Sequence, residues 1–249
     1  MKLNHDMKIL AWDVERTPAA GYHWGLYDQN IGIGQLIEHG EMVSFAARWV
    51  GEPKKNAVFY STHHNGKFEM LNALWDLHNE ADALLSWNGA GFDTKHANTE
   101  FILSGLTPPS PSKEIDLMRA AKKKFKFLSN KLDYVAQRLG VGQKIVHQGF
   151  PLWLKVMEGD PQAWESFKRY NLQDVHLLVE LYEKLLPWID GHPNANLFGA
   201  EGCARCGGKL QKRGFRQTQL GHYQRYQCTR CGAWSSSGKS ESRVDIRSL

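Results

Sequence analysis

The sequence Lys8-Ile9-Leu10-Ala11-Trp12-Asp13-Val14-Glu15 decides the fold, because an apolar run ends there on two acids. The run predicts a buried β-strand. Side chains alternate along a strand, so Asp13 and Glu15 extend the face that carries Ile9 and Ala11. A charge on such a face is costly unless it is paired or bound to a metal ion. The pattern therefore indicates either a metal or ion-pair site, or a strand that stops earlier and leaves both acids in solvent.

Downstream of this strand, the sequence predicts two more strands joined by a hairpin turn, and then helices that alternate with strands. Strands are expected at residues 42–50, 57–61, 83–87 and 115–118, and helices at residues 68–77, 94–103, 131–139 and 161–186. Three leading strands followed by such alternation predict an α/β fold, in which helices cover the faces of a mixed sheet.

The last and longest of these helices carries two polar residues on its inward face. Its apolar stripe has alternating spacings of three and four residues, and Asn171 and Asp174 interrupt it; the apolar members are Trp164, Phe167, Leu178, Leu181 and Leu185. Tyr170 lies four residues before Asp174, so the two are neighbours on the helix surface. This Asp is either a functional group or a buried acid that is satisfied by backbone hydrogen bonds.

A further acid, Asp93, follows the short apolar strand at residues 83–87 and the sequence Asn88-Gly89-Ala90-Gly91-Phe92. The two glycines permit a tight turn and a close approach of the backbone to a ligand. Asp93 is therefore a second candidate site residue. It could equally be the N-cap of the helix that follows.

If the fold brings these acids together, their mutual repulsion has one common explanation, which is a site for divalent cations. Carboxylates within about 4 Å of one another repel by roughly 4 kcal/mol per pair at an effective dielectric constant near 20. Divalent cations relieve that repulsion, and hard oxygen ligands suit Mg²⁺ or Mn²⁺. Two such ions, about 3.5–4 Å apart, can clamp a phosphodiester during in-line displacement.

Three segments of the sequence resemble the motifs of the DnaQ-like DEDD exonucleases. Trp12–Pro18 resembles the first motif, DxE, and Asn88–Asp93 resembles the second. Tyr170–Asp174 resembles the third in its YxxxD form, which marks the DEDDy branch. Ser129–Ala136 is similar to a segment of the group related to the exonuclease domain of family B DNA polymerases. The resemblance covers roughly residues 7 to 188.

This resemblance implies a ribonuclease H-like fold and a metal-dependent 3′→5′ exonuclease that uses two Mg²⁺ or Mn²⁺ ions. It assigns the metal ions to four acids, which are Asp13, Glu15, Asp93 and Asp174. It makes Tyr170 the residue that orients the attacking water, and Asn88 and Phe92 the residues that position the terminal nucleotide. Asp116 resembles an acid often found on the fifth strand of this group, and we expect it to be structural.

The C-terminal region contains all four cysteines, as Cys203-x2-Cys206 and Cys228-x2-Cys231, which 21 residues separate. Two such pairs predict a zinc ribbon with one structural Zn²⁺, although the spacer is about one residue beyond the usual range of roughly 15–20. The alternative is two disulfides in a secreted protein. The ribbon is not part of the catalytic core of the DEDD family, so the resemblance gives it no role.

Charge is distributed unevenly between the two regions. Residues 201–249 carry ten Lys and Arg against three Asp and Glu. The rest of the chain carries 21 Lys and Arg against 23 Asp and Glu. Bases interleaved with aromatic side chains predict a platform for single-stranded nucleic acid. The candidate contacts are Lys212, Arg213, Arg216 and Arg225. The alternatives are a solvated basic tail and aromatic residues that only pack a small core.

The composition bounds the remaining expectations. The chain has 249 residues, 42% of them hydrophobic, and no apolar run of the roughly 18 residues that a membrane span needs. Its N-terminus is not typical of a signal peptide, so we expect a cytoplasmic protein of a bacterium or a phage-infected host. The expected domains are an exonuclease domain at residues 1–190, a linker at 191–202, the ribbon at 203–234 and a flexible tail at 235–249.

The sequence therefore predicts a 3′→5′ exonuclease that binds nucleic acid, with single-stranded 3′ ends as the expected substrate and no membrane partner. Two alternatives stay open: a non-catalytic nucleic-acid-binding protein on a nuclease fold, and a structure-selective endonuclease. The sequence does not distinguish DNA from RNA.

Overall fold

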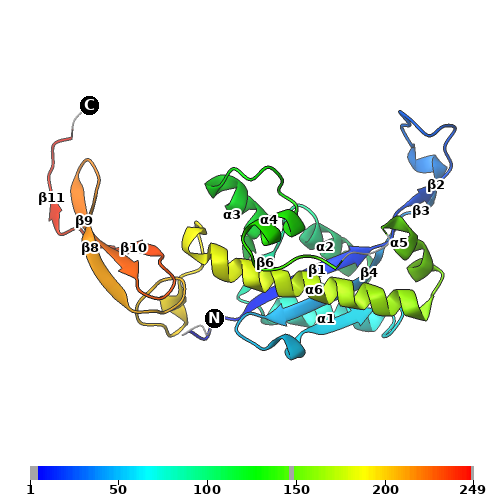
Figure 1. The fold of residues 1–249 in the computed structure, drawn as a ribbon, viewed down its shortest axis with the longest axis horizontal. Helices are drawn as coiled ribbons and strands as arrows, with labels where there is room; N and C mark the ends of the chain where they lie inside the picture. Colours follow the sequence, from blue (N-terminus) through cyan, green and yellow to red (C-terminus); the bar gives the residue numbers. More distant parts are fainter. Residues whose placement is uncertain (1–4, 146–148, 248–249) are drawn as a thin grey trace.

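Strand β1 (Ile9–Arg16) lies in the middle of a five-stranded mixed sheet. The structure is a computed structural model that describes residues 5–145 and 149–247 (Figure 1); the first residues of the expected exonuclease domain and the last two of the expected tail lie outside them. The order of the strands is β5 (Val58–Ser61), β4 (Met42–Trp49), β1, β6 (Ala83–Ser86) and β7 (Lys113–Asp116). Antiparallel pairs on one side of β1 and parallel pairs on the other confirm the predicted mixed sheet.

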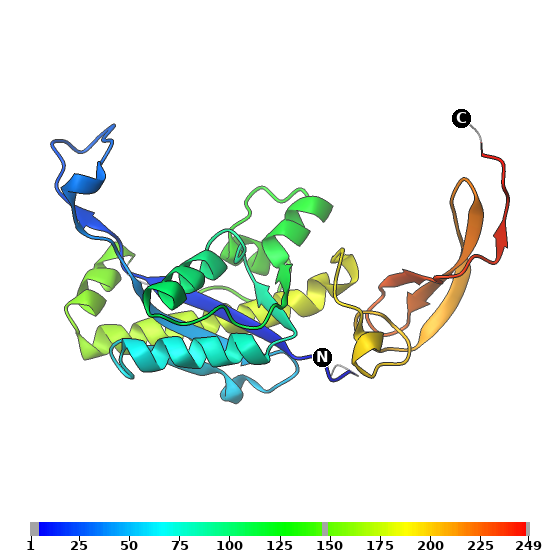
Figure 2. The same ribbon diagram turned by 180° about the vertical axis from the view of Figure 1, so that it is seen from behind.

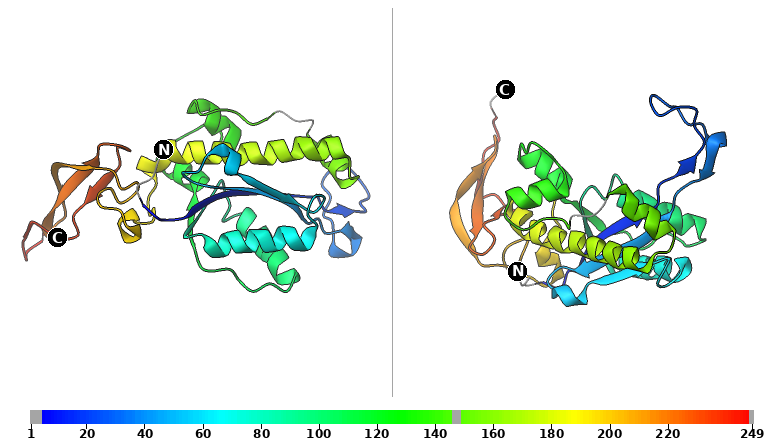
Figure 3. Two further views of the ribbon diagram at one scale, coloured as in Figure 1. Left: turned by 90° about the horizontal axis from the view of Figure 1, so that it is seen from below. Right: turned by 45° about the vertical axis from the view of Figure 1, so that its right-hand side comes forward.

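Helices cover both faces of this sheet, as the left panel of Figure 3 shows. One face packs on α1 (Lys67–Glu80) and α2 (Asp93–Leu103), and the other packs on α3 (Leu117–Lys124), α4 (Leu132–Arg138) and α6 (Pro161–Leu185). Within β1, Leu10 and Trp12 belong to the first core, while Ile9 and Ala11 belong to the second. The alternation predicted for this strand is therefore present, and it directs the side chains of odd number toward α6.

The long helix α6 begins where the sequence predicts. The side chain of Asp160 caps it by accepting from the backbone N–H groups of Gln162 and Ala163, and Pro161 occupies its first turn. The helix α5 (Phe150–Met157), which the sequence analysis did not predict, packs through Leu152 and Val156 against the start of α6. Neither α6 nor any other helix within residues 5–145 and 149–247 is long and apolar enough to cross a membrane.

Residues 17–41 form a projection that we call the arm, which the sequence analysis also did not predict. It contains the short strands β2 (Ala20–Gly21) and β3 (Leu36–Glu38), which pair with each other, and the 3₁₀ helix η1 (Ile33–Gln35). The arm leaves the end of β1 and rises away from the body, in dark blue in Figures 1 and 2. The C-terminal region rises from the opposite end of the body.

The C-terminal region is a small antiparallel sheet that packs on the end of α6. Its strands are β8 (Leu210–Gln217), β9 (Gly221–Cys228), β10 (Trp234–Ser236) and β11 (Ser242–Arg243). The last two strands lie largely where the sequence analysis expected a flexible tail. Cys203 and Cys206 share a core with Tyr182 and Leu186, and Arg205 donates to the Leu186 carbonyl at 2.6 Å.

The segment expected to be a linker is folded rather than extended. It contains the 3₁₀ helix η4 (Ala195–Phe198), and Ala195 is buried and donates its N–H to the Ala204 carbonyl at 2.7 Å. Phe198 in turn accepts from the N–H of Asp6 at 2.9 Å. Glycine, proline and asparagine in this segment form tight turns here, which explains why its composition resembles that of a linker.

Candidate functional site

Three of the predicted acids meet between β1 and α6. Asp13 and Glu15 point from the end of β1, and Asp174 points from the middle of α6. One carboxylate oxygen from each of the three lies within 4.8 Å of the others. The fold therefore gathers acids that are far apart in sequence, on the face of β1 that the alternation predicted.

The fourth predicted acid, Asp93, borders the same pocket from the other side of β1. It is the first residue of α2, and its carboxylate accepts a hydrogen bond from the backbone N–H of Val14 at 3.2 Å. Phe92, not Asp93, occupies the N-cap position, so the capping alternative is not what the structure shows. All four acids line one pocket of about 630 Å³, together with Asn88, Phe92 and Tyr170.

The turn between β6 and α2 depends on close packing of its backbone. Asn88 has a φ of 71°, in the left-handed region, and a Cβ on Gly89 would lie 2.1 Å from the Ser86 hydroxyl. Asp116 accepts hydrogen bonds at 3.1 Å from the N–H groups of both Asn88 and Arg119. Asp116 thus holds this turn and caps α3, which is the structural role that we expected for it.

Phe92 and Asn88, the two residues expected to position the terminal nucleotide, both line the pocket. The ring of Phe92 is 42% exposed and meets His96 edge-on, with 4.4 Å between ring centroids. A half-exposed aromatic ring beside a pocket offers a flat apolar surface for a base or a sugar.

The carboxylates of the pocket are strongly coupled to their surroundings. Burial, and next the neighbouring carboxylate of Asp174, raises the pKa of Glu15 from 4.5 to about 8. Burial, followed by the Asp93 carboxylate, raises the pKa of Asp13 well above its usual range. Burial also raises the pKa of Asp93, to about 6. The cluster is therefore costly to ionise as it stands.

This donor set fits a hard divalent cation. Asp174 is 2% exposed, and its Oδ1 has no hydrogen-bond partner among the residues that the structure describes. A buried oxygen without a partner, beside two further carboxylates, is what an oxygen-liganded Mg²⁺ or Mn²⁺ would satisfy. The acids Asp13, Glu15 and Asp174 could hold such an ion, and Asp93 lines the same pocket.

Asn171 fixes the orientation of Asp13. Its side-chain Nδ2 donates to Asp13 Oδ2 at 2.7 Å, and its Oδ1 accepts from the Ser44 hydroxyl at 3.3 Å. Asn171 and Ser44 are both fully buried. The sequence places this asparagine on the inward stripe of the helix but indicates no role for it, because its partner lies on a distant strand.

Lys144 is a site residue that the sequence analysis missed. Its ammonium forms an ion pair with Asp174 and donates to the Tyr170 hydroxyl at 3.1 Å. Its backbone N–H donates to Asp133 at 2.7 Å, which ties the loop to α4. Burial opposes the charge of Lys144, but the Asp174 carboxylate outweighs it and keeps the pKa of Lys144 above its ordinary value. No periodicity or motif in this loop marks the residue.

Tyr170 accepts a hydrogen bond from Lys144 and lines the pocket together with the acids. Burial, and then the nearby Glu15 carboxylate, raises the pKa of Tyr170 above its ordinary value of 10. The phenol therefore keeps its proton at neutral pH and can donate a hydrogen bond. A phenol that keeps its proton is a hydrogen-bond donor and a poor proton acceptor at neutral pH.

The four cysteines form a second cluster, compatible with a zinc ribbon. The four Sγ atoms lie within 4.8 Å of one another, with 3.7 Å between those of Cys203 and Cys231 and also between those of Cys206 and Cys228. Thiolates placed tetrahedrally at about 2.3 Å from a Zn²⁺ ion lie about 3.8 Å apart. All four cysteines are free, so the disulfide alternative does not describe this structure.

The exposed face of the ribbon combines cations with aromatic rings. Arg216 lies over the ring of Tyr223, 5.3 Å from its centroid, and Arg225 lies over Trp234 at 5.1 Å. Arg225 also donates to the Arg213 carbonyl, so it contributes to the structure of the hairpin. Lys212, Arg213 and Arg216 are exposed.

A sequence model of the RNase_H superfamily matches residues 37–186, more than half of the chain. The chain belongs to the RNase H superfamily. A search of curated proteins finds no relative of this RNase H-like chain. Among solved structures, a family B DNA polymerase from the hyperthermophilic archaeon Pyrobaculum calidifontis is similar, with a TM-score of 0.55 at 19% identity. The match covers 73% of this chain and 25% of the polymerase, and at this identity it shows a shared fold.

Membership in the superfamily gives the acidic pocket its chemical context. RNase H-like nucleases act on nucleic acid with divalent metal ions, and here the acidic cluster lies at the end of β1 beside α6. The fold of this chain is thus an RNase H-like nuclease fold, with a four-cysteine cluster near its C-terminus.

Proposed function

We propose that this RNase H-like protein is a metal-dependent 3′→5′ exonuclease of the DEDDy branch. The observation that carries the proposal is the convergence of Asp13, Glu15 and Asp174 within 4.8 Å, beside Tyr170 on the same helix as Asp174. Asp93 lines the same pocket and completes the four acids. The YxxxD spacing of Tyr170 and Asp174 is the feature that favours the DEDDy branch.

The four acids would hold two divalent cations, which supply an activated water and charge stabilisation at the leaving 3′ oxygen. The residues of the chain prepare that chemistry. Asn171 holds the Asp13 carboxylate in one orientation through its 2.7 Å hydrogen bond. Tyr170 stays protonated and would orient the attacking water by donating a hydrogen bond.

The mouth of the pocket would receive the end of the strand. Phe92 offers an exposed ring for the terminal nucleotide, and the neighbouring Asn88 lines the same pocket. Among the described residues, Lys144 is the lysine whose ammonium pairs with an acid of this pocket. It offsets part of the negative charge of the acids before substrate and metal ions bind. This ammonium would reduce the repulsion between the carboxylates and a polyanionic substrate.

The ribbon would bind the same nucleic acid at a distance from the pocket. Lys212, Arg213, Arg216 and Arg225 would contact phosphates, and the aromatic rings beneath them would support stacking. A structural Zn²⁺ held by Cys203, Cys206, Cys228 and Cys231 would fix the hairpins that present these side chains.

The test is incubation of end-labelled single-stranded and double-stranded DNA and RNA with Mg²⁺ or Mn²⁺. We expect products that shorten progressively from the 3′ end with wild-type protein and no cleavage with Asp174→Ala or with the isosteric Asp174→Asn. Internal products would instead indicate an endonuclease, and binding without cleavage would indicate a non-catalytic binding protein. Cleavage by folded Asp174→Asn at the wild-type rate would refute the metal-site assignment.

A further inference from the structure

The arm exposes an unusual amount of apolar side chain. Trp24 is 98% exposed, and Leu26 and Tyr27 are each 83% exposed. Further large apolar side chains, at Tyr22, Ile33 and Ile37, are also more than half exposed. Soluble proteins rarely keep such clusters in water, and a larger exposed patch commonly marks an interaction surface.

The backbone of the arm is nevertheless organised. Tyr22 and Gln35 exchange hydrogen bonds across it, from the Tyr22 N–H to the Gln35 carbonyl at 2.8 Å and from the Gln35 side chain to the Tyr22 carbonyl at 2.9 Å. At its foot, the Thr17 N–H donates to the Glu41 carbonyl at 2.9 Å. The arm is thus a formed structure that presents its apolar side chains outward, rather than an unfolded loop.

The charge of the arm argues against nucleic acid as its partner. From residue 17 to residue 47 the sequence has no Lys or Arg, while Asp28, Glu38 and Glu41 are acidic. The arm thus offers no Lys or Arg of its own to phosphates, and the release of counterions by such residues is what drives binding to nucleic acid. The basic ribbon at the other end of the molecule has the opposite character.

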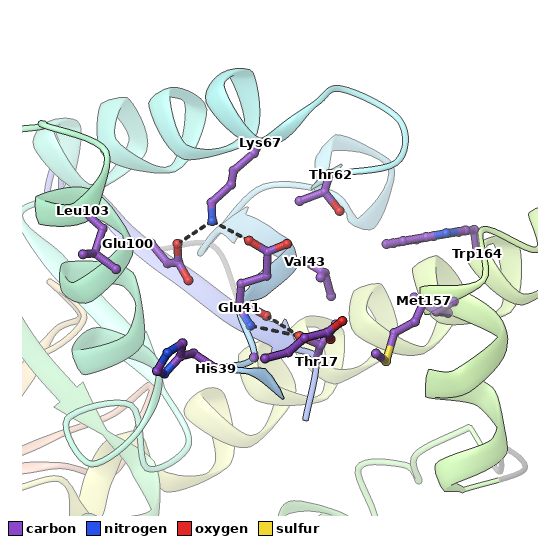
Figure 4. A pocket seen from close by; sticks show the side chains of 13 residues that line it. Thr17, His39, Glu41, Val43, Thr62, Lys67, Glu100, Leu103, Met157 and Trp164 are labelled. Atoms are coloured by element: carbon purple, nitrogen blue, oxygen red, sulfur yellow. Dashed lines mark hydrogen bonds and ion pairs between the residues drawn. The ribbon is translucent and has the colours of Figure 1, made fainter. Parts of the chain in front are cut away.

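A pocket of about 580 Å³ opens at the foot of the arm, as Figure 4 shows. Its walls carry the carboxylates of Glu38, Glu41 and Glu100, against a single lysine, Lys67, which pairs with the last two. The carboxylates therefore outnumber the cation, and a further cation would be attracted.

The apolar side of this pocket is formed by Trp164 and by neighbouring residues such as Val43 and Met157 (Figure 4). Trp164 is 3% exposed, and its indole N–H has no hydrogen-bond partner among the described residues. An Arg or Lys side chain has the matching character, because its apolar stem can lie against Met157, which is 42% exposed, while its charged end reaches the carboxylates.

We propose that the arm and the pocket at its foot form a docking surface for a protein partner that presents a basic and apolar segment. Apolar side chains of the partner would cover Trp24, Leu26 and Tyr27, and a Lys or Arg side chain would enter the pocket. Two other occupants, a second copy of this chain and single-stranded nucleic acid, are tested below. The proposal does not depend on the exonuclease activity.

The experiment selects random peptides displayed on phage against the immobilised full-length protein and measures the affinity of synthetic copies of the enriched peptides. The arm variant carries Trp24→Ser, Leu26→Ser and Tyr27→Ser, which replace exposed side chains and should preserve the fold. Glu38→Lys reverses a charge of the pocket. Leu197→Ser is the matched control, because Leu197 is 80% exposed but lies in η4.

We expect enriched peptides that combine Lys or Arg with large apolar residues. Their affinity should fall at least about tenfold in the arm variant and in Glu38→Lys, and should be unchanged in Leu197→Ser. Cleavage of short oligonucleotides should be equal in all four proteins.

Three results would each overturn the proposal. The first is a selection that enriches no peptide, or that enriches peptides whose affinity is the same for the arm variant and the wild-type protein. The second is self-association in sedimentation velocity that the arm variant abolishes, since a second copy would then occupy the surface. The third is photo-crosslinking of a single-stranded oligonucleotide to the arm.

Discussion

The side-chain amide of Asn171 donates to the carboxylate of Asp13, with 2.7 Å between Nδ2 and Oδ2. The two residues are 158 positions apart in sequence, and the bond joins α6 directly to β1. The Ser44 hydroxyl fixes the direction of the amide by donating to its oxygen. The orientation of the Asp13 carboxylate is therefore set by a neutral residue, Asn171.

Replacing this asparagine should damage the metal site more than the fold. We expect Asn171→Leu to weaken metal activation and to lower cleavage by about ten- to a hundredfold, because the Asp13 carboxylate is then free to rotate. Ser44→Ala should also weaken metal activation and lower cleavage, but by a smaller factor. Titration of activity with Mn²⁺ checks this, and an unchanged dependence on Mn²⁺ concentration would show that Asn171 only packs.

Metal binding should become stronger as the pH rises through about 8. Burial raises the pKa of Glu15 from 4.5 to about 8, so at pH 7 a cation must displace a proton from it. Calorimetric titration of Mn²⁺ in buffers of different ionisation enthalpy should report proton release at pH 7. Binding that releases no proton would contradict this.

The same shift affects stability without metal. The unfolded chain releases the Glu15 proton near pH 4.5, whereas the folded chain keeps it until about pH 8. This carboxyl therefore lowers the free energy of unfolding progressively as the pH rises from about 4.5 to about 8. Urea denaturation in the presence of a chelator measures this slope, and saturating Mn²⁺ should remove it.

Lys144 should stabilise the protein chiefly when no metal is bound. Lys144→Met leaves the buried Asp174 without its cation, which we expect to cost about 1–3 kcal/mol of unfolding free energy in a chelator, since Lys144 itself is partly exposed. Saturating Mn²⁺ should shrink that loss by replacing the missing charge. A loss of equal size with and without Mn²⁺ would argue that the lysine acts by packing alone.

The bases of the ribbon should control the salt dependence of binding. If Lys212, Arg213 and Arg216 each contact a phosphate of single-stranded nucleic acid, changing all three to Gln should reduce the slope of log affinity against log salt by about 2. The matched control removes three exposed lysines from the body, by changing Lys55, Lys113 and Lys184 to Gln. An equal effect of the two variants would mean that the ribbon is not a specific contact.

Loss of zinc should destabilise the end of α6 as well as the ribbon. Cys203 and Cys206 share a core with Tyr182 and Leu186, so the thiolate cluster and the end of α6 support each other. We expect Cys206→Ser to lose bound zinc and to lose hydrogen-exchange protection both in β8 and β9 and in the last turns of α6. Full protection of α6 in the zinc-free variant would show that the two parts fold independently.

The sequence predicted the elements whose residues repeat with a clear period. The alternation in Ile9–Glu15 and the stripe of residues 161–186 located β1, α6 and three of the acids. The arm, α3 and α5 were not predicted, because the arm has no periodic pattern and the two helices have only eight residues each. Lys144 and the role of Asn171 depend on contacts between distant segments, which no local pattern encodes.

The role of Asp93 could not be predicted from the sequence for a different reason. Its sequence context allowed either an N-cap or a site residue, and only the position of its carboxylate distinguishes them. The structure directs that carboxylate across to the N–H of Val14 on β1. Which of two plausible partners a side chain finds is decided by the packing of α2 on the sheet.

Helix α6 carries Asp174 in its middle and ends in the core that contains Cys203 and Cys206. At a rise of about 1.5 Å per residue, the helix spans about 16 Å between Asp174 and Leu185. A rigid helix of this length would hold the cleavage point and the basic hairpins at a fixed separation. Oligonucleotides too short to bridge that separation would be cut without help from the ribbon, so the rate of cleavage should fall abruptly below a threshold length.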